Sequence, residues 1–167
     1  MSTGKVLGMR PGYGFALLAS IGLALLAGYI GSAFTLPAIP SWYASLEKPF
    51  LTPPSAVFGP VWTTLYVLMG IAAFRIFRKR TQVPKLAHRA LALYGVHLLV
   101  NTSWSLVFFG GRNPELGVAV IVLLWSMIVV LTLWFSRIDR PAAYLMLPYL
   151  AWVSFATYLN VAIAILN

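Results

Sequence analysis

The stretch "ELGVAVIVLLWSMIVVLTLWFS", residues 115–136, decides the fold, because it contains no charged residue after Glu115. A helix of about 20 apolar residues crosses the hydrocarbon core of a bilayer. Comparable runs lie near residues 14–36, 56–78, 87–109 and 141–165. The sequence therefore predicts an all-α fold: an integral membrane bundle of five transmembrane helices that forms a single domain over residues 1–167.

The composition excludes a water-soluble domain. Hydrophobic residues make up 60% of the chain and charged residues only 9%, whereas a soluble domain carries about 25% charged residues. The chain has no cysteine, which excludes disulfides, thiolate nucleophiles and sulfur-ligated metal clusters.

The basic residues predict the orientation in the membrane. Of the 12 Lys and Arg residues, ten lie at the N-terminus or around the second and fourth connections, namely Lys5, Arg10, Arg75, Arg78, Lys79, Arg80, Lys85, Arg89, Arg137 and Arg140. Only Lys48 and Arg112 belong to the other side. The positive-inside rule then places the N-terminus in the cytoplasm, and the bacterial inner membrane is the expected location. Because these charges flank apolar runs, we expect no nucleic-acid binding.

The first connection, predicted as a loop over residues 37–55, is unusually long for this bundle. Pro37 and Pro40 are expected to stop the first helix, and "WYASLEKPFLTPP" follows at residues 42–54. Two interpretations are open. The loop rests in the membrane interface, where Trp and Tyr settle, or it folds over the outer mouth of the bundle like a lid.

Three of the predicted spans carry aromatic and polar residues at helical spacing. The stripes are Trp62, Tyr66, Met69 and Ala73, then Tyr94, His97, Asn101, Trp104 and Phe108, and then Tyr149, Trp152, Ala156 and Asn160. Polar side chains in lipid face protein or a cavity, so these stripes are expected to face inward. They either hold the helices together or line a mostly apolar pocket for a small molecule.

His97 is expected to be a hydrogen-bonded interior residue. It could ligate a metal or haem iron, but His88, the second histidine, lies in the basic connection. No metal site is therefore predicted. The three acidic residues, Glu47, Glu115 and Asp139, all sit at connections, which disfavours proton-coupled transport. The first span is rich in small residues that permit close helix packing or dimerisation, among them Gly22, Ala27, Gly28, Gly31 and Ser32.

Four segments resemble one known family, in order and across nearly the whole chain from about Pro40. They are "WYASLEKPFLTPP", "VFGPVWTTLYVLMGIAA", "NTSWSLVFFG" and "PYLAWVSFATYLNVAIAILN". The family is that of the tryptophan-rich sensory proteins and translocator proteins (TspO/MBR, also called peripheral benzodiazepine receptors). The resemblance implies a five-helix membrane protein, commonly a homodimer, that binds porphyrins and flat hydrophobic ligands within the bundle, beneath the first connecting loop.

The resemblance also implies site residues. Ligand contacts are expected from Trp62, Tyr66, His97, Asn101, Trp104, Trp152, Ala156, Trp42 and Leu51. Leu51 and His97 depart from the family pattern, since a Trp usually precedes the two prolines and the third helix usually carries Gln or Asn. No cofactor is required, and protoporphyrin IX or haem is the expected ligand, with a sensor or receptor role. Light-dependent porphyrin degradation through Trp62 and Trp152, or transport of a tetrapyrrole or lipid, are the alternatives.

Overall fold

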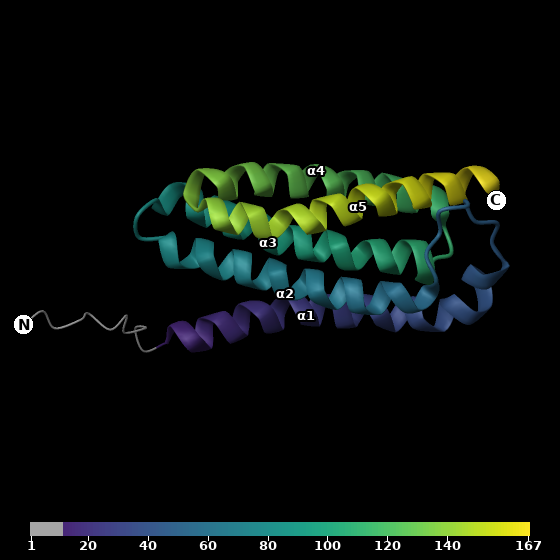
Figure 1. Ribbon diagram of the computed structural model, residues 1–167, viewed down its shortest axis with the longest axis horizontal. Helices are drawn as coiled ribbons and strands as arrows, with labels where there is room; N and C mark the ends of the chain where they lie inside the picture. The colour runs from purple at the N-terminus through teal and green to yellow at the C-terminus, as the bar shows by residue number, and fades with distance from the viewer. Residues whose placement is uncertain (1–11) are drawn as a thin grey trace, which may run out of the picture.

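Five long helices lie side by side in the computed structural model, which describes residues 12–167 (Figure 1). The helices are α1 (Tyr13–Ala38), α2 (Ser55–Lys79), α3 (Pro84–Ser105), α4 (Pro114–Ile138) and α5 (Arg140–Leu166). No strand occurs in this range. Each helix is long and apolar enough to cross a membrane, so the predicted all-α bundle of five transmembrane helices is confirmed.

The starts of the later helices follow local sequence signals. Pro84 and Pro114 occupy the first positions of α3 and α4, where a missing backbone N–H costs nothing. Asn113 caps α4 by accepting a hydrogen bond from the Leu116 N–H, and Asp139 caps α5 by accepting one from the Ala142 N–H. These caps satisfy backbone donors that a helix start leaves free.

The first helix continues further than the sequence predicted. It runs through Pro37 and passes into a π-helical turn over Ile39–Tyr43 that contains Pro40. Membrane helices tolerate proline because local π adjustments re-satisfy the freed backbone groups, so neither proline ends this helix. The expected loop over 37–55 is therefore shorter, and irregular backbone begins only after Ser45.

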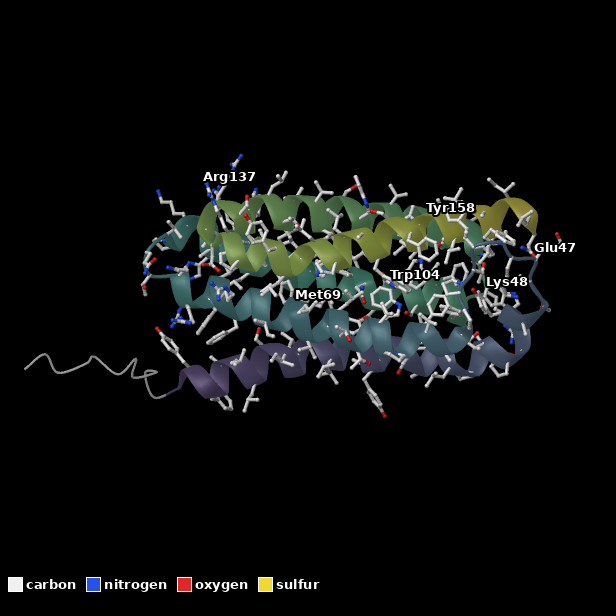
Figure 2. All side chains as sticks on the ribbon, viewed as in Figure 1. Glu47, Lys48, Met69, Trp104, Arg137 and Tyr158 are labelled. Atoms are coloured by element: carbon white, nitrogen blue, oxygen red, sulfur yellow. The ribbon has the colours of Figure 1, made fainter. Side chains whose placement is uncertain are left out.

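The helices pack as a closed ring. Going round the bundle, α1 contacts α2, α2 contacts α5, α5 contacts α4, α4 contacts α3, and α3 returns to α1. Figure 2 shows Met69 of α2 within this ring, and its side chain is completely buried. All three predicted stripes turn inward: of their members, only Trp62, Trp104 and Trp152 keep partial exposure.

The contact of α1 with α2 is closest at Gly70. A Cβ atom there would lie 2.5 Å from the Cα atom of Ile21, so only glycine permits this approach. The Ser20 hydroxyl donates a 2.8 Å hydrogen bond to the Gly70 carbonyl oxygen, and the Thr102 hydroxyl of α3 donates one of 3.1 Å to Ala27. These contacts fix α1 against two neighbours, α2 and α3.

Basic side chains gather at one end of the bundle. Figure 2 shows Arg137 there and Glu47 and Lys48 at the opposite end. Lys5 and Arg10, which the orientation prediction also uses, lie outside the described residues. At the basic end the Arg75 Nε atom of α2 donates a 2.6 Å hydrogen bond to the Asp139 carboxylate. This ion pair ties α2 to the corner between α4 and α5.

The Arg75–Asp139 ion pair predicts a pH dependence of stability. Partial burial raises the pKa of Asp139. This effect is outweighed by the hydrogen bond and charge of Arg75, together with the Ala142 N–H and the Lys79 charge, so the pKa lies below the ordinary aspartate value. The ion pair therefore stabilises the fold fully above the ordinary aspartate pKa. This stabilisation is lost as pH falls through the lowered pKa of Asp139. Arg75 is 35% exposed, so Asp139→Asn should lower the free energy of unfolding at neutral pH by about 1 kcal/mol.

Unfolding of the detergent-solubilised protein at several pH values measures this effect. The difference between wild type and Asp139→Asn should shrink at acid pH, because protonated Asp139 no longer attracts Arg75. Glu115→Gln is the matched control, since Glu115 forms no ion pair within residues 12–167. A difference that is the same at every pH would contradict the assignment.

Candidate ligand-binding site

A cavity of about 590 Å³ lies between α1, α2, α3 and α5, in the half of the bundle that carries the first connection. No residue of α4 lines it. This volume is within the range of about 300–1,000 Å³ that is typical of small-molecule sites. The half of the bundle nearer the basic end is filled instead by buried side chains such as Met69, Ile76 and Leu131.

Aromatic rings from α2 and α5 form one wall of the cavity. The Trp62 and Tyr66 rings stack with centroids 5.6 Å apart. The Trp152 ring meets Phe58 edge-on at 5.9 Å, and the Trp62 ring meets Tyr149 edge-on at 6.2 Å. Rings that are already packed against one another offer a flat ligand a preformed surface, because little side-chain freedom remains to be lost on binding.

Trp104 of α3 forms part of the facing wall, and two amide groups hold it in place. Its indole N–H donates a 2.9 Å hydrogen bond to the Asn160 side-chain oxygen, and the Asn160 amide nitrogen donates one of 2.8 Å to the Pro114 carbonyl oxygen. The Trp104 ring also stacks on Phe108 at 5.3 Å. Figure 2 shows Trp104 inside the bundle.

A chain of polar groups runs from the cavity wall into the protein. The Tyr66 hydroxyl donates a 2.5 Å hydrogen bond to the Asn101 side-chain oxygen. The Asn101 amide nitrogen donates one of 2.8 Å to the Tyr149 hydroxyl oxygen, which lies 2.8 Å from the His97 Nε2 atom. Tyr66 and Asn101 line the cavity, whereas Tyr149 and His97 do not.

The remaining wall comes from α1 and was missed by the sequence prediction. Residues at helical spacing supply it, namely Leu25, Gly28, Tyr29, Ser32, Leu36, Ile39 and Tyr43. Tyr29 is 75% exposed, so this wall reaches the outer surface of the bundle. The helical spacing of these residues is visible in the sequence, but the predicted helix ended at residue 36 and so left out Ile39 and Tyr43.

Six of the nine predicted ligand contacts line the cavity: Trp62, Tyr66, Asn101, Trp104, Trp152 and Ala156. The other three do not. Trp42 packs edge-on against Phe108 at 5.6 Å, His97 is completely buried behind its bond to Tyr149, and Leu51 is 58% exposed. Because α1 extends to Tyr43, Trp42 lies on a helical turn rather than in a loop.

The first connection is tied to the far end of α5. The Glu47 backbone N–H donates a 2.9 Å hydrogen bond to the Asn167 side-chain oxygen, and the Asn167 amide nitrogen donates one of 3.1 Å to the Glu47 carbonyl oxygen. The Lys48 ammonium lies 4.9 Å from the centre of the Tyr43 ring, which itself lines the cavity. The segment thus spans from α1 to α5 at the end of the bundle nearest the cavity (Figure 1).

Comparison with known proteins shows to which family this chain belongs. The sequence model of the TspO/MBR family matches residues 20–166. The chain belongs to the TspO/MBR family. It is accordingly a multi-pass integral membrane protein, and the cavity described above lies within the part of this TspO/MBR chain that the family model covers.

Three related proteins align with the sequence of this chain over most of their own length. The chain is similar to tryptophan-rich protein TspO of Chlorobaculum tepidum, at 43% identity over 90% of this chain and 95% of the relative. It is 41% identical to tryptophan-rich protein TspO of Archaeoglobus fulgidus, over 90% of this chain and 96% of that protein. The translocator protein of Bos taurus is 36% identical over 90% of this chain and 86% of its own length.

Gly28 controls the cavity of this TspO/MBR chain, because its missing side chain leaves room for the Tyr66 ring. A Cβ atom at Gly28 would overlap that ring. Gly28→Ala should therefore displace Tyr66 from Trp62 and Asn101, costing about 1–3 kcal/mol of stability and weakening ligands that contact Tyr66. Thermal unfolding in detergent and ligand titration would measure the two effects.

Gly22→Ala is the matched control. Gly22 lies on the same helix, and a Cβ atom there would meet nothing within 4 Å. Both substitutions gain about 1 kcal/mol of helix propensity, so their difference isolates the contact with Tyr66. Equal stability and equal ligand affinity in the two variants would show that Tyr66 does not depend on this space.

Proposed function

We propose that the protein is a membrane receptor that binds porphyrins, such as protoporphyrin IX or haem, in the cavity between α1, α2, α3 and α5. Family membership supports a receptor or sensor role in the membrane. The observation that carries the ligand class is the cavity wall: indole and phenol rings from four helices line a space of about 590 Å³ whose walls are mostly apolar.

The chemistry of a porphyrin matches this wall. Its flat, apolar π-system can stack on Trp62 or meet Trp104 and Trp152 at their edges, and each such contact stabilises by about 0.5–1.5 kcal/mol beyond the area buried. Its two carboxylates need water or cations. The Lys48 ammonium offers a cation near the outer end of the cavity, because it lies 4.9 Å from the centre of the Tyr43 ring, which lines the cavity.

Haem is bound through its ring rather than its iron in this proposal. The His97 Nε2 atom is already in contact with the Tyr149 hydroxyl, and His97 does not line the cavity. A haem iron needs a single axial side chain, and no His, Cys or Met residue is among the described residues that line the cavity. Metal-free and iron porphyrins should therefore bind with similar affinity.

The orientation proposed from the sequence fits the same arrangement. The end of the bundle with Arg75, Arg137 and Arg140 would face the cytoplasm, as the positive-inside rule requires. The cavity and the first connection would then lie toward the opposite side of the bacterial inner membrane. Ligand would enter at that side or from the outer half of the bilayer.

Titration of the purified protein with protoporphyrin IX, followed by the absorption of the porphyrin, tests the proposal. Replacing both cavity indoles, Trp62→Ala with Trp152→Ala, removes two ring contacts and should weaken binding by about tenfold or more. The absorption signal is preferable to tryptophan fluorescence, because the substitutions themselves alter the latter.

Trp125→Ala is the matched control for this experiment. Trp125 lies on α4, is 39% exposed and does not line the cavity. Its substitution should leave porphyrin affinity unchanged. Thermal unfolding of each variant separates a loss of fold from a loss of ligand contact. Unaltered affinity in the folded double variant would show that porphyrin binds elsewhere or not at all.

A further inference from the structure

Four side chains form a single file of hydrogen bonds between the cavity and the interior. Tyr66, Asn101, Tyr149 and His97 follow one another at 2.5, 2.8 and 2.8 Å. Tyr66 lines the cavity at one end of this file. His97 is completely buried at the other end, so a ligand reaches the file at Tyr66 and at its neighbour Asn101, which also lines the cavity.

The directions of these hydrogen bonds depend on one another. The Asn101 oxygen only accepts, so Tyr66 donates to it, and the Asn101 nitrogen only donates, so the Tyr149 oxygen accepts from it. The hydrogen of Tyr149 then has one remaining partner, the His97 Nε2 atom. Nε2 therefore carries the lone pair, and the proton of the neutral imidazole resides on Nδ1.

The same four groups can form the file in the opposite direction. With the proton on Nε2, His97 donates to Tyr149, and Tyr149 donates to the oxygen of an Asn101 amide turned by half a rotation. The Asn101 nitrogen then donates to the Tyr66 oxygen. The Tyr66 hydroxyl hydrogen then becomes free, on a residue that lines the cavity.

The two directions leave opposite ends of the file without a partner. The His97 Nδ1 atom has no hydrogen-bond partner within residues 12–167. The Nδ1 N–H is therefore unpaired in the observed direction and the Tyr66 O–H in the reverse direction, while the second N–H of the Asn101 amide has no partner within residues 12–167 in either direction. An unpaired buried donor costs free energy in both cases, but of the two ends only the Tyr66 donor lies within reach of a ligand.

We propose that His97, acting through Tyr149 and Asn101, sets whether the cavity wall at Tyr66 accepts or donates a hydrogen bond. An acceptor group on the ligand, such as a carbonyl or carboxylate oxygen, reverses the file by pairing with the Tyr66 hydrogen. A ligand N–H keeps the observed direction. His97 is thus a positioning residue for the ligand, and this role rests on the proposed ligand site.

The histidine tautomer reports the direction of the file. Nuclear magnetic resonance of protein carrying isotopically labelled histidine distinguishes the two protonated nitrogens of a neutral imidazole. His88, which is exposed, gives a second signal that is assigned with His88→Gln. The probes are three tricyclic molecules of similar shape: fluorenone with a carbonyl acceptor, carbazole with an N–H donor, and fluorene with neither.

Fluorenone is expected to move the His97 proton from Nδ1 to Nε2, whereas carbazole and fluorene leave it on Nδ1. Wild type should also prefer fluorenone over fluorene by about fivefold, the effect of one hydrogen bond. Tyr66→Phe should abolish this preference. Displacement of each probe by protoporphyrin IX shows that it occupies the cavity.

Two Tyr→Phe variants separate the relay from general packing around His97. Tyr149→Phe interrupts the file, so the His97 tautomer should no longer respond to fluorenone. Tyr94→Phe is the matched control: its ring stacks on His97 at 5.7 Å, but its hydroxyl has no partner within residues 12–167. The response should persist in Tyr94→Phe.

The possible results separate this inference from the proposed function. Fluorenone that binds in the cavity while the His97 tautomer stays unchanged would overturn the relay and leave the ligand site intact. A His97 tautomer that is the same with fluorenone and with carbazole bound would also overturn the relay. Failure of all three probes to bind would overturn the ligand site, and the relay with it.

Discussion

A polar side chain inside the hydrocarbon of a membrane is costly unless it finds a partner within the protein, and this cost organises most of the polar contacts inside the bundle. Three buried polar residues, His97, Asn101 and Asn160, lie on helices that face one another. Asn160 joins Trp104 to the start of α4, and Asn101 joins Tyr66 to Tyr149. The aromatic walls of the cavity are therefore held by amides as well as by packing.

The position of the cavity follows from where the helices approach closely. At Gly70 of α2 the missing side chain makes room for Ile21 of α1, and the bundle toward the basic end is filled by side chains such as Met69. At Gly28 of α1 the missing side chain instead makes room for the Tyr66 ring, and both residues line the cavity. Glycine therefore permits close packing of α1 and α2 at Gly70, and within the cavity it leaves the space that Tyr66 occupies.

The sequence predicted the helices and most of the cavity because both depend on periodicity. Apolar runs of membrane length and stripes such as Trp62, Tyr66 and Met69 are properties of the chain alone. Most of the α1 wall was missed because its small residues, such as Gly28 and Ser32, were assigned to helix packing or dimerisation; only Ile39 and Tyr43 were missed because prolines were taken as helix ends. Leu51 was assigned to the cavity through the family resemblance, but the extension of α1 changes the path of the first connection.

The polar file illustrates what periodicity leaves undetermined. The spacing of His97 and Asn101 showed that both face inward, yet only the contact with Tyr149 shows that His97 reaches the cavity indirectly. Which side chain contacts a ligand and which one orients that contact depends on distances between helices. A stripe predicts a shared face, whereas the order of groups across that face is a property of the packed bundle.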